Sequence, residues 1–146
     1  MAGPALSAAR TRPGLAVTLD DFDIADGPRL SGAERHAAIL SSLERHRIRA
    51  AGFPAGKFVD NDPARRHLQT WSQRGHLIGN HSYSHSFYAG GSPERMMADI
   101  LREEPLLSAF PTFRKWFRYP YLAEGKTAEG RDGLRRLLQA NGYRNA

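Results

Sequence analysis

Residues 77–85 read Leu-Ile-Gly-Asn-His-Ser-Tyr-Ser-His, a short apolar run followed by two histidines four positions apart. The apolar run predicts a buried strand over His76–Gly79, and the histidine pair follows at its carboxyl end. If the chain turns helical after Asn80, His81 and His85 share one face, and both imidazoles can converge on a single ion. This spacing alone also fits two solvated loop histidines, so a metal site requires a third ligand from elsewhere in the chain.

An acidic pair far upstream can supply that ligand. The apolar run Leu15–Leu19 predicts another buried strand, which ends abruptly in Asp20 and Asp21. One carboxylate and two imidazoles make a three-ligand site with open positions, as a catalytic metal requires. The chain has no cysteine, so the ligands must be His, Asp, Glu or water, which suits zinc or a similar divalent ion. The second carboxylate, left unligated, is then the natural general base. Without the histidines, a turn or capping role would explain the acid pair better.

Strands and helices alternate along the chain. The expected strands are Leu15–Leu19, Ile48–Phe53, His76–Gly79 and Lys115–Arg118. The expected helices run from a Ser31 capping box to Arg47, from Asp62 as N-cap to Gly75, from a Ser92 cap through Leu107, and from Arg131 to Ala140. This alternation predicts a parallel sheet, doubly wound or barrel-like. We expect Met96, Met97, Trp116 and Phe117 to pack in the core.

Ligands of such sheets bind at the carboxyl ends of the strands. The acid pair Asp20 and Asp21, the pair His81 and His85, and the stretch Arg118–Tyr121 all fall at predicted strand ends. This coincidence is the strongest indication of a functional site in the sequence.

Length and composition indicate one soluble globular domain. The chain has 146 residues, 40% hydrophobic and 25% charged. We expect a flexible lead-in over residues 1–13 and the domain proper over residues 14–146. The formal net charge of +6 raises the alternative of a nucleic-acid-binding protein. Its arginines are scattered without interleaved aromatic residues, however, so we expect a solvated surface and no nucleic-acid partner.

No apolar stretch approaches the roughly 20 residues of a membrane span. The segment Met1–Gly14 lacks the apolar core of a signal peptide. The chain as given is therefore expected in the cytoplasm, and outside it if the true start lies upstream.

Three motifs together resemble the polysaccharide deacetylase family, also called the NodB-homology domain or carbohydrate esterase family four. In chain order they are Thr18-Leu19-Asp20-Asp21, His81-Ser82-x-x-His85 and Arg118-x-Pro120-Tyr121. The resemblance extends from Leu15 to Tyr143. It implies an α/β fold with a parallel-stranded, barrel-like (β/α) sheet, incomplete at about four βα units of a distorted barrel.

The resemblance also implies a role for each polar motif residue. Asp20 would be the general base and Asp21 a metal ligand, with His81 and His85 completing the metal site. Arg118 would hold Asp20 ionised and oriented. The implied cofactor is a divalent metal, with zinc the expected ion.

The implied reaction is metal-dependent hydrolysis of an N-acetyl (or O-acetyl) group on a chitin-like or peptidoglycan-like glycan. This makes the protein a hydrolase acting on carbon–nitrogen bonds other than peptide bonds, with an acetylated carbohydrate as its partner. The backbone N–H of Tyr121 would help to stabilise the tetrahedral oxyanion. Tyr119 and Pro120, in the same motif, are expected to contact the substrate.

The sequence departs from the family in several places. Leu19 and Phe22 flank the acid pair where the family usually has Phe and Gly, which alters the mouth of the pocket. No histidine follows His85 and no aspartate follows Asp132, so the family's last two motifs, including the general-acid histidine, are missing. We therefore expect the N-terminal part of a deacetylase domain, with weak or no activity and an open sheet edge that a partner chain could complete.

Other functions remain open at this point. The missing acid favours a non-catalytic glycan- or metal-binding module as the first alternative. An iron oxygenase is formally compatible with two histidines and one carboxylate. The neighbouring acid and Arg118 fit hydrolysis better.

Overall fold

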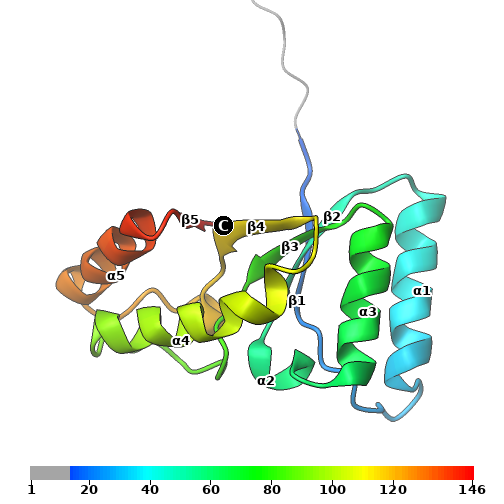
Figure 1. Ribbon diagram of the computed structural model, residues 1–146, viewed down its shortest axis with the longest axis horizontal. Helices are drawn as coiled ribbons and strands as arrows, with labels where there is room; N and C mark the ends of the chain where they lie inside the picture. Colours follow the sequence, from blue (N-terminus) through cyan, green and yellow to red (C-terminus); the bar gives the residue numbers. More distant parts are fainter. Residues whose placement is uncertain (1–13) are drawn as a thin grey trace, which may run out of the picture.

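The computed structural model describes residues 14–146 as one parallel sheet with helices packed against it (Figure 1). The predicted lead-in over residues 1–13 lies outside the described residues. The strands are β1 (Val17–Asp21), β2 (Ala50–Pro54), β3 (Leu77–Asn80), β4 (Phe113–Phe117) and β5 (Arg144–Asn145). The helices are α1 (Gly32–Arg45), α2 (Gly56–Val59), α3 (Asp62–Gln73), α4 (Pro93–Leu107) and α5 (Ala128–Ala140), with a 3₁₀ turn, η1, at Pro120–Leu122.

The sheet has the order β1-β2-β3-β4-β5, so each strand pairs with the next one along the chain. All four pairings are parallel, and Asp21 stands opposite Pro54 at the carboxyl end of the first pair. The parallel α/β fold predicted from the sequence is therefore confirmed. Because the strands run the same way, the carboxyl ends of β1, β3 and β4 meet at one edge of the sheet.

Side-chain caps set most of the helix starts. Ser31 forms the predicted capping box with Glu34, and Ser92 caps α4 as predicted. Helix α3 is capped by Asn61 rather than by Asp62, which is instead the first helical residue. Thr127 caps α5, which therefore begins before the predicted Arg131. The short α2 was not predicted.

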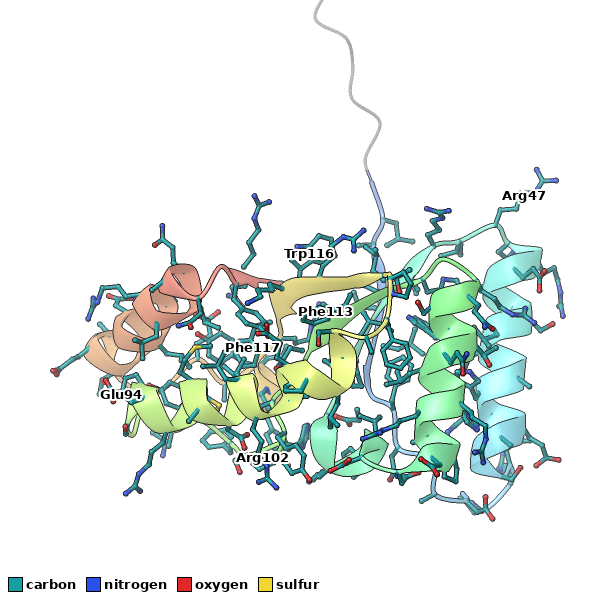
Figure 2. The ribbon with its side chains drawn as sticks, viewed as in Figure 1. Arg47, Glu94, Arg102, Phe113, Trp116 and Phe117 are labelled. Carbon is teal, nitrogen blue, oxygen red and sulfur yellow. The ribbon has the colours of Figure 1, made fainter. Side chains whose placement is uncertain are left out.

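The two faces of the sheet differ. Phe113 and Phe117 lie on the side of β4 that faces the helices, and Trp116 lies on the other side (Figure 2), as strand alternation requires. Trp116, Phe53 and Leu77 there line a hollow of about 620 Å³. The predicted core position is thus confirmed for Phe117 and wrong for Trp116, because the helices cover only one face.

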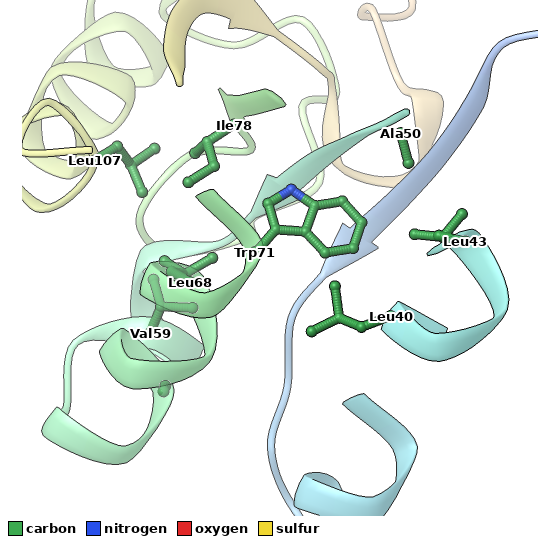
Figure 3. Close-up of a cluster of buried hydrophobic side chains, with 9 residues drawn as sticks. Leu40, Leu43, Ala50, Val59, Leu68, Trp71, Ile78 and Leu107 are labelled. Carbon is green, nitrogen blue, oxygen red and sulfur yellow. The ribbon is translucent and has the colours of Figure 1, made fainter. Parts of the chain in front are cut away.

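The first core cluster lies between α1, α3 and the sheet (Figure 3). Leu40 and Leu43 from α1 and Leu68 and Trp71 from α3 contribute its buried side chains. The indole N–H of Trp71 donates to the Leu77 carbonyl at 2.9 Å, which ties α3 to the start of β3.

The second cluster joins α4 and α5 to β4. Met96 and Met97 are buried in it, which confirms their predicted packing role. Ile78 of β3 and Leu107 of α4 belong to the first cluster, so the strand that precedes the histidines is held by the core. No helix within residues 14–146 combines the length and the apolar character that crossing a bilayer would need.

Candidate metal and catalytic site

Asp21, His81 and His85 converge at the carboxyl edge of β1 and β3. Asp21 Oδ1 lies 3.4 Å from His81 Nε2 and 2.9 Å from His85 Nε2. The three donor atoms all lie within 4.8 Å of one another. The structure thus brings together the three residues that the sequence analysis predicted as metal ligands.

The imidazole of His81 is held in one orientation. Its side chain is 3% exposed, and its Nδ1 lies 2.8 Å from the Arg118 carbonyl oxygen. With Nδ1–H donating to that carbonyl, Nε2 presents its lone pair toward Asp21. Burial lowers the pKa of His81, which favours the neutral imidazole that a metal requires.

No helix follows Asn80; His81 and His85 lie on a loop that brings their imidazoles together. Ser82 and His85 adopt the left-handed backbone conformation, with φ of 64° and 53°. The Asn80 side-chain oxygen accepts from the Ser82 N–H at 2.9 Å, and Asp99 accepts from the Ser84 N–H at 3.0 Å. These polar contacts hold the loop in a shape that brings the imidazoles together, so the helix considered for this stretch is wrong.

The three residues fit a small divalent ion. Asp21 Oδ1 is buried and has no hydrogen-bond partner, although two imidazole nitrogens lie close to it. Tetrahedral coordination at 2.0–2.1 Å places neighbouring ligand atoms about 3.4 Å apart. The observed separations from this oxygen match that geometry after a shift of a few tenths of an ångström, and two nitrogens with one carboxylate oxygen suit zinc and similar ions.

Asp20 lies next to the three ligands and faces Arg118. Asp20 Oδ1 is 3.8 Å from Arg118 Nε, and the two side chains are 35% and 18% exposed. The guanidinium also lies over the ring of Phe53, at 4.7 Å from its centroid. This packing places the cation beside the carboxylate, while Arg118 Nε itself has no hydrogen-bond partner. The orienting role of Arg118 stays a prediction.

Tyr121 reaches the site from η1. Its side chain is 64% exposed, and its ring centroid lies 4.8 Å from that of His85. The residue has a φ of 58°, which turns the chain sharply after Pro120. The role of its backbone N–H toward an oxyanion stays a prediction.

The side chains of Tyr119 and Pro120 are buried, so they are not exposed to a substrate at the metal site. Tyr119 packs edge-on against Phe117, with ring centroids 4.8 Å apart, and its burial raises its pKa to about 12. Its side chain belongs to the cluster of β4, α4 and α5. The predicted substrate contact by these side chains is therefore corrected.

The sequence analysis did not identify one polar residue beside the site. Glu103 on α4 is fully buried, and its Oε2 accepts from the His81 backbone N–H at 3.1 Å. Burial raises its pKa well above the usual range. The signal was available, since Glu103 falls on the same helix face as the buried Met96, Ile100 and Leu107.

The sequence model of the family described as polysaccharide deacetylase matches residues 8–146. A curated peptidoglycan-N-acetylglucosamine deacetylase of Bacillus cereus is 30% identical over 108 residues, covering 73% of this chain and 36% of that protein. This chain thus spans about a third of that relative's length.

Solved structures show the same fold. The peptidoglycan deacetylase PdaC of Bacillus subtilis is 26% identical with a TM-score of 0.65, covering 90% of this chain and 56% of that one. A CE4 family pseudoenzyme from Bacillus anthracis is 20% identical with a TM-score of 0.67, covering 89% of this chain and 42% of that one. The pseudoenzyme supports the fold alone.

Proposed function

The chain belongs to the polysaccharide deacetylase family, and from this premise we propose that it hydrolyses the N-acetyl groups of a carbohydrate, with a divalent metal as cofactor. The observation that carries the proposal is the convergence of Asp21, His81 and His85 beside the Asp20–Arg118 pair. Hydrolysis needs both parts, because one set of residues holds the ion and the other is free to move a proton.

The proposed substrate is a glycan that contains N-acetylated amino sugars, of the chitin or peptidoglycan kind. The Bacillus cereus relative is a peptidoglycan-N-acetylglucosamine deacetylase, which supports an acetylated amino sugar here as well. The open position of the site supports it too, since Asp21 is about half exposed and a polymer can approach from solvent.

We propose zinc as the ion, held by Asp21, His81 and His85. When bound, such an ion supplies Lewis-acid polarisation of the acyl carbonyl and a water that is acidic near neutral pH. The neutral imidazole of His81, oriented through the Arg118 carbonyl, is ready to bind without first losing a proton.

Asp20 then takes the proton of the attacking water as general base. Its carboxylate is partly open to solvent and has the Arg118 guanidinium on one side. The guanidinium Nε lies 3.8 Å from a carboxylate oxygen of Asp20, which places a cation beside the proposed base. Removing such a base costs roughly 10²- to 10⁴-fold in rate.

A second candidate is a glycan-binding module without catalysis. The observation that favours it is the loose contact between Asp20 and Arg118: Arg118 Nε lies 3.8 Å from Asp20 Oδ1 and has no hydrogen-bond partner, so the proposed base is less firmly held than the metal ligand His81. Binding and hydrolysis are separable by experiment, so the two functions give different results.

The test uses the zinc-loaded chain and N-acetylated chitotetraose, with acetate release and glycan binding measured in parallel. We expect slow acetate release from the unaltered chain. Asp20→Asn should keep its zinc and its binding but lose release by roughly 10²- to 10⁴-fold. Glycan binding with no acetate from the unaltered chain would favour the binding module. Neither binding nor release would refute both functions.

A further inference from the structure

A second hollow lies at the amino edge of the sheet, at the opposite ends of the strands from the metal site. Two of the residues that line it, Arg49 and His76, directly precede β2 and β3. Its volume is about 310 Å³, within the range of pockets that bind small ligands, roughly 300–1,000 Å³. None of the residues that line it belongs to the three sequence motifs, so the hollow is separate from the proposed catalytic machinery.

Most charged side chains of this hollow are cations. Arg47, Arg49 and Arg74 line it, together with one carboxylate, Glu44. Arg74 forms an ion pair with Glu44, and no ion pair within residues 14–146 involves Arg47 or Arg49. Arg47 extends into solvent beyond the end of α1 (Figure 2). The two unpaired guanidinium groups suit a ligand with two negative charges.

His76 adds a buried donor to the wall of the hollow. The residue is 4% exposed, and its Nδ1 accepts from the Ala50 backbone N–H at 3.2 Å. Burial, and then the charges of Arg74 and Arg49, lower the pKa of His76, so the ring is neutral near pH 7. A nitrogen that accepts carries no proton, and the neutral ring therefore has its proton on Nε2. This N–H has no acceptor within residues 14–146, so a ligand oxygen in the hollow can accept from it.

The position of Arg49 is not explained by the helix ends nearby. The carboxyl ends of α1 and α3 carry partial negative charge, which attracts cations. Arg74 is the C-cap of α3 and fits that role. Arg49 lies outside both helices, and its Nη2 is 3.3 Å from the position that a Cβ would take at Gly75. The missing side chain at Gly75 thus leaves room for the guanidinium against the backbone.

We propose that this hollow binds a phosphate group, either as the free ion or as a small phosphomonoester. Arg47 and Arg49 donate to its charged oxygens, and His76 Nε2–H donates to another. Phosphate fits because a monoester carries a charge of roughly −1.5 to −2 at pH 7 and three acceptor oxygens. A neutral sugar would leave both guanidinium groups without a counter-charge. The inference does not rest on the proposed function, since the hollow lies at the other edge of the sheet.

The test titrates the zinc-loaded chain with inorganic phosphate at constant ionic strength, followed by nitrogen NMR of the histidine rings. We expect the Nε2 signal of His76 to shift in a saturable way. Arg49→Ala should weaken phosphate binding by about 5- to 10-fold, the scale of a charged hydrogen bond partly open to solvent. Arg49→Lys, which keeps the charge, should weaken it less. Zinc affinity should stay the same in both variants.

Arg136→Ala is the matched control, because it removes the same charge from an exposed position on α5, outside the hollow. An equal loss of affinity in Arg136→Ala and Arg49→Ala would overturn the proposal, since only the net charge would then matter. A shift confined to the ring signals of His81 and His85 would also overturn it, because phosphate would then bind only at the metal.

The same titration with two esters defines the ligand. Glycerol phosphate is a monoester and should bind, and tighter binding than that of inorganic phosphate would identify a phosphomonoester as the ligand. Tighter binding of inorganic phosphate would identify the free ion. Dimethyl phosphate carries only one charge and should bind more weakly than either. Equal binding of dimethyl phosphate would overturn the assignment of the hollow to a doubly charged phosphate group.

Discussion

Replacing Asp21 by Ala should remove most of the stabilisation of the protein by zinc. A ligand that binds only the native state at 100 times its dissociation constant adds about 2.7 kcal/mol to the free energy of unfolding. For a chain of 146 residues, this corresponds to a rise in melting temperature of about 10 °C. Without Asp21 the site keeps only two imidazoles, so at the same zinc concentration the shift should fall to about 1–2 °C.

The metal-free proteins should behave differently. Asp21 Oδ1 is a buried oxygen without a hydrogen-bond partner, so removing it relieves an unfavourable burial. The metal-free Asp21→Ala variant should therefore melt at the same temperature as the unaltered chain or slightly higher. A metal ligand should show both effects when it is replaced: unchanged or higher stability without zinc, and a smaller stabilisation when zinc is added. A residue that merely supports the fold should instead lower the stability of the metal-free protein.

The assay is thermal unfolding followed by circular dichroism, after chelation and again after adding zinc. His85→Ala should lose the zinc shift in the same way. His46→Ala is the matched control, because His46 is exposed at the end of α1, away from the site, and should keep the full shift. An equal zinc shift in Asp21→Ala and the unaltered chain would refute the assigned ligand set, and no shift in the unaltered chain would refute the metal site.

Three further predictions concern the residues around the ligands. Arg118→Ala should reduce acetate release by about 10- to 100-fold with little change in zinc affinity, because it orients Asp20; a proportional loss of zinc would contradict this role. Glu103→Ala should lower the free energy of unfolding in urea by about 1–3 kcal/mol, because the His81 N–H loses its acceptor, while Glu103→Gln keeps an acceptor and should lose less. His36 has a pKa lowered to about 4, mainly by burial, so the unfolded chain takes up a proton near pH 6.5 and the native protein only near pH 4. The free energy of unfolding should therefore fall by about 1–2 kcal/mol as the pH drops from about 6.5 to about 4, after allowance for the half-exposed ring. In His36→Leu, urea unfolding should show no such fall. An unchanged pH dependence in the variant would show that His36 does not cause the loss of stability.

The sequence by itself determined the order of elements and the edge at which the chemistry lies. The apolar runs before Asp20 and before His81 predicted buried strands, and alternation with helices predicted that these strands are parallel. Parallel strands share one carboxyl edge, so residues far apart in the sequence had to meet there. The order and direction of the strands were predicted correctly because hydrophobic periodicity and capping depend on neighbours within a few positions. The predicted burial of the first strand was wrong, because β1 lies at the edge of the sheet with no fully buried residue and Leu15 is 91% exposed.

The tertiary structure alone decided the backbone conformation of the loop that carries the histidines at that edge. The histidines converge through left-handed backbone at Ser82 and His85, a conformation that costs free energy for residues other than glycine and persists only with support from elsewhere. That support comes from Asp99, and Glu103 anchors the His81 backbone; both lie on the following helix.

The same holds for the side chains that can meet a substrate. Tyr119 carries a motif position yet is buried, while Phe87 lies outside every motif and is exposed. Local pattern assigns residues to a strand or a loop. Which of them faces solvent depends on which face of the sheet the helices cover, and that is settled by packing between segments distant in the sequence.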